Sequence, residues 1–315
     1  MLRSRNWIVL LSLLLLSIAS TAQAAQPVTL EGLLSAPIPD PPVAAARAEV
    51  IAWSANERGV RNAWVARAPQ FEPRRLTAYG EDDGQPLTSL KLSADGRWLA
   101  YVRGSAPDAA GTSSNPDSDP DGAEQAVWIV PADGSAAPRQ IAPGNTPLFA
   151  PQGDALLVHA KGRISCHTLA PDGPAPDWCV ESLLKARGNN TASGFSPDGR
   201  QLLFTSNRGD HAFIGVLDLH ARQVRWVAPD FNRDSAPVWS PDGRRIAFLR
   251  TAGLKPGSAF NLTAANAFEV WSADAASGKA MRLHRSSDDA GGYAQFGVAA
   301  PLQFARDGRV VFASE

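Results

Sequence analysis

The sequence has 315 residues, of which 44% are hydrophobic and 19% charged, so it can bury a sizeable core. Wholesale disorder is excluded, because burial of that much apolar surface can offset the entropy of ordering the chain. Lys and Arg number 30 against 31 Asp and Glu, which excludes a nucleic-acid-binding protein that relies on bulk positive charge. The one long hydrophobic run lies at the N-terminus, and this excludes a multi-pass membrane protein.

The first 24 residues have the pattern of a secretory signal peptide. Arg3 and Arg5 precede an uncharged stretch at 7–18, and Ala22-Gln23-Ala24 provides a small-x-small cleavage site. An uncleaved membrane anchor is the alternative, but a helix that crosses the bilayer needs about 20 apolar residues. We therefore expect residues 1–24 to be removed, no membrane span to remain, and the mature chain to reach the periplasm or the external medium.

A segment of about ten residues recurs along the chain. Residues 92–101 (LSADGRWLAY) are repeated as 195–204 (FSPDGRQLLF) and 239–248 (WSPDGRRIAF), and weaker copies occupy 149–158 and 304–312. The turn glycines lie at positions 96, 153, 199, 243 and 308, so the steps between them are 57, 46, 44 and 65 residues. A period in the forties with insertions is typical of β-propeller blades, each a sheet of four strands.

The centre of the repeat has the composition of a tight turn between two strands. Proline favours the φ of the first turn position, aspartate can hydrogen-bond its own backbone, and glycine tolerates a positive φ. An apolar residue precedes the turn and a β-rich apolar run follows it, as in a β-hairpin. Further short apolar runs follow each hairpin, and no long helix is predicted.

The sequence therefore predicts an all-β protein in the form of an incomplete β-propeller. We expect residues 25–47 to form an N-terminal arm and residues 48–315 a propeller of five four-stranded blades, which begin near positions 48, 88, 146, 191 and 236. A sixth blade, which begins near 300, has room for only its first two strands. Unpaired strand edges are unfavourable, so this half blade either stays open, borrows strands from a partner or belongs to a longer protein. We favour the last.

Cys166 and Cys179 are the only cysteines in the sequence. They lie symmetrically about Asp172-Gly173, a turn signal between two short apolar runs. In an antiparallel hairpin folded at that turn they fall opposite one another, where a disulfide is geometrically possible and an oxidising compartment preserves it. A pair of buried free thiols is the alternative. Two cysteines without neighbouring ligands do not form a zinc site.

No catalytic, cofactor-binding or metal-ligating residue is predicted. The five histidines lack a metal-ligand spacing and are interpreted as surface or strand residues: His159, His167, His211, His220 and His284. Residues 117–122 (DSDPDG) imitate the start of a calcium-binding loop. The twelfth position is Trp128 in place of the bidentate glutamate, so a polar insertion is the better interpretation.

Several stretches outside the turn repeat carry a family resemblance. They are residues 75–79 (RLTAY) with 82–85 (DDGQ), 115–120 (NPDSDP), 206–211 (SNRGDH) and 233–237 (RDSAP). From about Leu30 to its last residue, the chain resembles the N-terminal propeller of exported serine peptidases of the prolyl-oligopeptidase family, which includes dipeptidyl and acylaminoacyl peptidases. The Ser-Pro-Asp-Gly repeat alone is less specific, because TolB-like periplasmic propellers share it.

The resemblance implies a function in proteolysis. In that family the propeller caps a C-terminal α/β-hydrolase domain with a catalytic Ser, Asp and His, and the Ser lies in a G-x-S-x-G elbow. That spacing is absent here, so no catalytic residue is carried over and the chain is expected to be inactive by itself. The resemblance thus implies a module that admits and orients peptides for an α/β-hydrolase domain, with no cofactor and no nucleic acid. A TolB-like module that binds proteins or peptides is the alternative.

Overall fold

The computed structural model describes residues 29–106, 124–169, 175–253, 267–287 and 302–312. The predicted signal peptide (1–24) and the calcium-like segment (117–122) lie outside these residues. The chain divides into two units, one that ends at Ala36 and one that starts at Pro37. The first contains the short helix α2 (Leu30–Leu34). Within the described residues, no helix is long and apolar enough to cross a membrane.

The second unit begins with a five-stranded sheet in which two short strands share one edge. The strands are β1 (Ile38–Pro39), β2 (Val43–Ala44), β3 (Val50–Glu57), β4 (Val60–Arg67) and β5 (Arg74–Arg75). Ile38 pairs with Asn56 and Val43 pairs with Ala52, so β1 and β2 form one interrupted strand along β3. The first sheet therefore starts at Ile38, within the region that the sequence assigned to an N-terminal arm.

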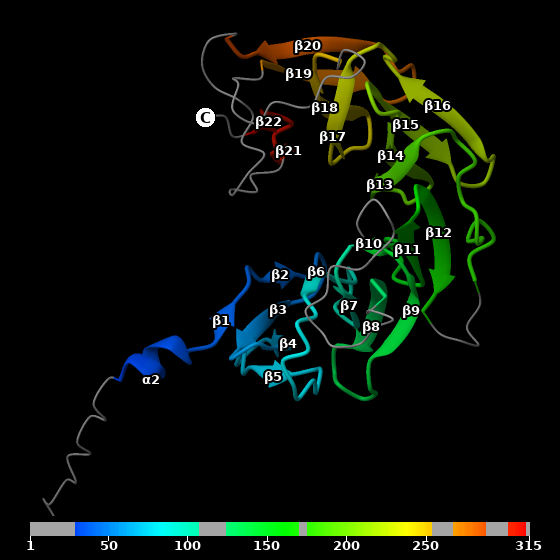
Figure 1. Ribbon diagram of the computed structural model, residues 1–315. Coiled ribbons are helices and arrows are strands. Elements are labelled where there is room, and N and C mark those ends of the chain that lie inside the picture. Colours follow the sequence, from blue (N-terminus) through cyan, green and yellow to red (C-terminus); the bar gives the residue numbers. More distant parts are fainter. Residues whose placement is uncertain (1–28, 107–123, 170–174, 254–266, 288–301, 313–315) are drawn as a thin grey trace, which may run out of the picture. The chain divides into compact units, whose positions relative to one another are not determined.

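Further sets of antiparallel strands follow in the order of the chain, and we number them as blades (Figure 1). The fourth and fifth sets are joined in one eight-stranded sheet by a single parallel pair between β15 and β17. The second blade consists of β6 (Leu87–Leu92), β7 (Trp98–Arg103), β8 (Ala126–Pro131) and β9 (Arg139–Pro143), and the third of β10 (Asn145–Phe149), β11 (Ala155–Ala160) and β12 (Arg163–Thr168). The fourth consists of β13 (Asn189–Phe195), β14 (Gln201–Asn207), β15 (Ala212–Asp218) and β16 (Gln223–Val227). The fifth consists of β17 (Arg233–Trp239), β18 (Arg245–Thr251), β19 (Phe268–Asp274) and β20 (Ala280–Arg285), and the sixth of the hairpin β21 (Gln303–Phe304) and β22 (Val310–Val311). The predicted all-β class is confirmed.

The third blade differs from the prediction of four strands, because its described residues form only three strands. In the place of a fourth strand, a non-strand segment runs beside β12. The Cys166 N–H donates to the Val180 carbonyl at 3.2 Å, and the Leu183 N–H donates to the Ile164 carbonyl at 3.0 Å. Two hydrogen bonds do not make a continuous ladder, and Pro176 in this segment has no N–H to add to it.

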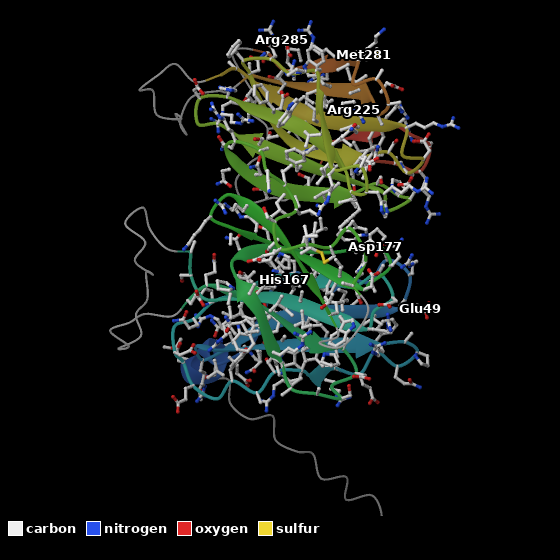
Figure 2. The ribbon with its side chains drawn as sticks, turned by 90° about the vertical axis from the view of Figure 1, so that its right-hand side faces the viewer. Glu49, His167, Asp177, Arg225, Met281 and Arg285 are labelled. Atoms are coloured by element: carbon white, nitrogen blue, oxygen red, sulfur yellow. A yellow bond between two sulfur atoms is a disulfide. The ribbon has the colours of Figure 1, made fainter. Side chains whose placement is uncertain are left out.

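A disulfide ties this segment to β12. It joins Cys166 of β12 to Cys179, with the two Cα atoms 5.2 Å apart. Figure 2 draws the bond in yellow and labels His167 and Asp177, which flank it along the chain. The cross-link holds the segment where β-sheet pairing alone would be weak.

The recurring turn is closed by its own side chains, as the fourth blade illustrates. Ser196 Oγ donates to Asp198 Oδ1 at 2.6 Å and accepts from the Gln201 N–H at 2.9 Å. The same carboxylate oxygen accepts from the Arg200 N–H at 3.1 Å, and Gly199 adopts a φ of +73°. The hydrogen bond from Ser196, followed by that from Arg200, lowers the pKa of Asp198. The recurrence of serine, aspartate and glycine is therefore explained by local hydrogen bonding and backbone geometry.

The turn glycines also lie against the preceding blade. A Cβ atom added to Gly243 would lie 3.3 Å from Cδ of Pro197, and one added to Gly308 would lie 2.7 Å from Nη2 of Arg245. Both glycines have a positive φ, so a side chain at either position would meet backbone strain as well as a close neighbour. The turns thus contribute to contacts between blades.

The middle strands of the second to fifth blades are buried on both faces, because each of these blades packs between two others. On β14, Leu202 and Phe204 pack in a cluster with Leu157 of the third blade. Leu203, which points to the opposite face, packs with Ile246 of the fifth blade. Burying each such side chain contributes about 1.5–3 kcal/mol. The alternation of side chains along a strand therefore decides which neighbouring blade each one contacts.

We predict that Ser196→Ala lowers the free energy of unfolding by about 1 kcal/mol at pH 7 and raises the pKa of Asp198, because a buried hydroxyl with two hydrogen bonds is lost. Since folding lowers this pKa from 3.8, the associated stability is present above that pH and is lost as the pH falls through the folded value. Urea denaturation at pH 7 and pH 2 should show a smaller difference at pH 2. Thr88→Ala, at an exposed strand position, is the control, and a Ser196 variant as stable as this control would contradict the prediction.

We predict that replacing both Cys166 and Cys179 by alanine lowers the free energy of unfolding by about 3 kcal/mol, because a closed loop of this size restricts the unfolded chain. Denaturation of the oxidised wild type, the reduced wild type and the variant measures the effect. The reduced wild type should resemble the variant. Equal stability of all three proteins would show that the cross-link does not hold the third blade.

Candidate functional site

A cavity of about 450 Å³ lies between the fourth and fifth blades. Its lining comes from β13 and β14 of the fourth blade, from β17 of the fifth blade, and from the residue before β21. We call this cavity the seam pocket. Among the described residues that line it, none is charged and none is a histidine or a cysteine.

One wall of the seam pocket is polar. Its side chains are Asn189, Thr191 and Ser193 of β13 and Thr205 and Asn207 of β14. Asn189 is the cross-strand partner of Asn207, and Thr191 is the partner of Thr205. Leu203, two residues before Thr205, points to the same face of the sheet and packs in the apolar core between the two blades. The polar wall is therefore the continuation of that core, on the same face of the same two strands.

The first strand of the fourth blade, β13, and the first strand of the fifth blade, β17, each carry a β-bulge where they border the seam pocket. The β13–β14 ladder changes register around Ser193, and the β17–β18 ladder changes register around Ala236 and Pro237. Ala236 has a φ of +48°. A bulge leaves its extra residue unpaired in the ladder, so backbone polar groups as well as side chains are available at this place.

The opposite wall of the seam pocket is apolar. It consists of Ala236, Pro237, Val238 and Leu302. Leu302 is 1% exposed and belongs to the apolar cluster shared by the fifth and sixth blades. The seam pocket is thus a slot with hydroxyl and amide groups on one side and hydrocarbon on the other. This arrangement suits an uncharged ligand that forms hydrogen bonds along one edge.

A buried ion pair lies just before the pocket-lining part of β17. Arg250 Nε donates to Asp234 Oδ1 at 2.7 Å and its Nη2 donates to Oδ2 at 2.9 Å. Nη2 also donates to the Ala228 carbonyl at 2.7 Å. Burial raises the pKa of Asp234, and the hydrogen bonds from Arg250 act against that rise. The two charges satisfy one another, so this pair is interpreted as structural.

Asn189 connects the seam pocket to a chain of hydrogen bonds that crosses three blades. Its Oδ1 lies 2.8 Å from Nε2 of His159, whose Nδ1 lies 3.1 Å from Oδ1 of Asn145. Asn145 Nδ2 donates to Gln125 Oε1 at 3.0 Å, and Gln125 Nε2 donates to the Gly104 carbonyl at 3.3 Å. The imidazole of His159 is thus in contact with a residue of the seam pocket.

A serine and a histidine also meet on β12, away from the seam pocket. Ser165 Oγ lies 2.8 Å from Nε2 of His167. Burial lowers the pKa of His167, and the nearby Glu181 acts against this. Among the described residues His167 has no second hydrogen-bond partner, so no carboxylate orients its ring as a catalytic triad requires. This pair therefore has only part of the geometry of a nucleophilic site.

The other residues considered from the sequence lie apart from one another. His211 bonds to Asp210 at 2.6 Å, and His284 packs against Phe268 and Phe312. In the described part of the chain, no group of three or more potential metal ligands comes together. Asn207, Ala236 and Pro237 lie in stretches that carry the family resemblance, but the sequence predicted no binding site there. The sequence feature that could have indicated the pocket is the row of polar residues at alternate positions of β13. A strand that is buried on both faces is usually a continuous apolar run, so polar residues on one face indicate a space beside it.

Two comparisons by sequence find no relative. No known family's sequence profile matches the chain, and no curated protein matches it.

Solved structures with a similar fold exist. A dipeptidyl aminopeptidase IV from Bacteroides ovatus is 10% identical, with a TM-score of 0.54 over 78% of this chain and 40% of that protein. An oligogalacturonate lyase in complex with manganese is 13% identical, with a TM-score of 0.51 over 84% and 68% of the two chains. TolB from Agrobacterium tumefaciens is 16% identical, with a TM-score of 0.47 over 79% and 81%. The first two likenesses show a propeller-type fold.

We predict that a serine-directed fluorophosphonate probe does not label Ser165. The reason is that His167 lacks a carboxylate partner, so the pair cannot activate the hydroxyl as a complete triad does. Intact-mass spectrometry after incubation of the pure chain measures labelling, and trypsin serves as the positive control. Stoichiometric labelling of Ser165 that disappears in His167→Gln would contradict the prediction.

Proposed function

We propose that this chain is the propeller part of an exported serine peptidase of the prolyl-oligopeptidase type, in which it receives and orients peptide substrates. The observation that carries the proposal is the seam pocket, with a ladder of uncharged hydrogen-bonding side chains facing an apolar wall. Export is proposed from the signal-peptide pattern of residues 1–24, with the periplasm or the external medium as the destination.

An uncharged, extended peptide fits the chemistry of this pocket. Its N–H and C=O groups alternate along one edge, and the Asn189–Asn207 and Thr191–Thr205 pairs offer donors and acceptors in a row. The wall formed by Pro237 and Val238 can cover a small apolar side chain or a proline ring. The volume of about 450 Å³ is within the usual range for small-molecule sites. An oligogalacturonate, whose units carry carboxylates, fits less well because none of the described lining residues is a cation.

The pocket is suited to binding rather than to hydrolysis. Its hydroxyl groups have no histidine or carboxylate beside them among the lining residues. Peptide-bond cleavage is therefore assigned to a separate α/β-hydrolase domain, to which the propeller supplies substrate in a defined orientation. By this proposal the described chain changes which peptides are cleaved and does not itself cleave them.

A TolB-like binding module is the second candidate function. The observation that favours it is an exposed aromatic cluster beside the β14–β15 turn. Phe231 is 82% exposed, and its ring lies 5.7 Å from that of His211, which in turn lies 4.8 Å from Phe213. The Arg208 guanidinium lies 5.5 Å from the Phe213 ring centroid. Aromatic and arginine side chains of this kind are common anchors in protein–protein interfaces.

We predict that acetyl-Ala-Ala-Pro-Ala-amide binds the pure chain and that Thr191→Val with Thr205→Val weakens this binding by about 30-fold. The double variant keeps side-chain volume and removes two hydroxyls, each worth about 1 kcal/mol in a hydrogen bond. NMR titration at pH 7 measures the dissociation constant. Thr88→Val is the matched control, because Thr88 is an exposed strand residue outside the pocket.

The same titration separates the two candidate functions. Loss of peptide binding in Phe231→Ser, with unchanged binding in the Thr191 and Thr205 double variant, would favour the aromatic cluster. Unchanged affinity in both variants would contradict both placements of the peptide.

A further inference from the structure

The hydrogen-bond chain that ends at Asn189 has a fixed direction, because its far end is a backbone carbonyl. The Gly104 oxygen can only accept, so Gln125 must turn its Nε2 toward it. Gln125 Oε1 then faces Asn145 and accepts from its Nδ2 at 3.0 Å. Asn145 Oδ1 is thereby turned toward His159 Nδ1, at 3.1 Å, and it also lies 2.9 Å from Thr146 Oγ1. Each amide orientation follows from the one before it.

This direction determines which ring nitrogen of His159 carries a proton. Because Asn145 presents an acceptor, Nδ1 must be the donor. In a neutral imidazole Nε2 then has only a lone pair, and it needs a donor from Asn189. In a charged imidazolium Nε2 also carries a proton, and it needs an acceptor from Asn189. The structure places Asn189 Oδ1 at 2.8 Å from Nε2, which is the arrangement that suits the charged ring.

Asn189 can satisfy both states by a half-turn of its amide. Among the described residues, the hydrogen-bond partner of this side-chain amide is His159 alone. The side chain of Asn189 lies at an exposed position that lines the seam pocket. With a charged ring, Oδ1 faces His159 and the amide NH2 remains for the pocket. With a neutral ring, the amide NH2 donates to Nε2 and Oδ1 remains for the pocket. The two amide atoms differ little in size, so packing does not oppose the exchange.

We propose that His159 is a specificity-determining residue that sets the hydrogen-bonding polarity of the seam pocket through Asn189. The pocket offers an acceptor at this position when the ring is neutral and a donor when the ring is charged. A ligand carbonyl is therefore favoured in the charged state, and a ligand N–H or O–H is favoured in the neutral state. The effect on ligands rests on the proposed function of the seam pocket. The tautomer of His159 is independent of that function, because it follows from the hydrogen bonds of Gln125 and Asn145 alone.

The elements around His159 leave its ring without an ionic partner. Among the described residues, the charged groups on the neighbouring strands and turns are Glu124, Asp154, Lys161, Arg163 and Arg187, all exposed, and β12 also carries the half-buried, titratable His167. Within the part of the chain that the structure describes, none of these forms an ion pair or hydrogen bond with the imidazole. Strands β10 and β13, which carry its two amide partners, contain no charged residue. Asn145 and Asn189 are thus the groups that respond to a proton on this ring.

The first test is the tautomer itself, which needs no ligand. Long-range ¹H–¹⁵N NMR of the uniformly labelled full chain at pH 8 should show His159 with its proton on Nδ1, although free histidine prefers Nε2. The signals are assigned by comparison with His159→Gln, and His220 at an exposed turn is the internal reference. A neutral His159 with its proton on Nε2 would overturn the proposal, whatever the pocket binds.

The second test uses a probe that contains only acceptors, acetyl-tetrasarcosine dimethylamide. Its affinity for the wild-type chain should be about three- to tenfold higher at a pH where the ¹⁵N shifts show a charged His159 ring than at a pH where they show a neutral ring, the range that one hydrogen bond provides. The affinity should be independent of pH in His159→Gln and should keep the wild-type dependence in the control His220→Gln. A pH dependence that persists in His159→Gln would overturn the proposal. Absence of probe binding at both pH values would contradict the pocket's proposed function, and the tautomer would still decide the role of His159.

Discussion

The alternation of side chains on β13 and β14 determines both how the fourth blade packs and what the seam pocket offers. On β14, Leu202 and Phe204 face the third blade, whereas Leu203 and Thr205 face the fifth. A shift of one residue in the pairing would exchange these two sets. It would place hydroxyls in the core and leave leucine in the pocket. The register is therefore stabilised by apolar burial on both faces, and the polar wall follows from it.

The buried charges beside the seam pocket, those of Asp234 and Arg250, neutralise one another in an ion pair. Asp234 lies two residues before the pocket residue Ala236, and Arg250 lies on the adjacent strand β18. The two side chains form two hydrogen bonds with one another, and Arg250 forms a third with the backbone. Each would be costly to bury alone. The result is a neutral pocket next to a buried ion pair. In the part of the chain that the structure describes, His159 is the titratable group whose side chain forms a hydrogen bond with a pocket side chain, that of Asn189.

Much of the fold was predictable because its signals are local. The Ser-Pro-Asp-Gly turns depend on hydrogen bonds between residues two to five positions apart, so their composition predicted each hairpin. The position of Cys166 and Cys179 about a turn signal likewise predicted that they could face one another. The missing fourth strand of the third blade was not predictable from periodicity. The segment that contains Cys179 takes the place of this strand. It makes two backbone hydrogen bonds to β12, too few for a continuous ladder, and the disulfide holds it there.

By itself, the sequence determined the all-β class, the repeating hairpins and the absence of a recognisable catalytic motif, because these depend on neighbouring residues and on the period of the repeat. Only the tertiary structure placed β1 and β2 beside β3 and brought Asn189 and Pro237 to one pocket. The contact of His159 with Asn189 joins side chains 30 residues apart in different blades. Such contacts depend on how whole sheets pack face to face, and no local pattern along the chain encodes that packing.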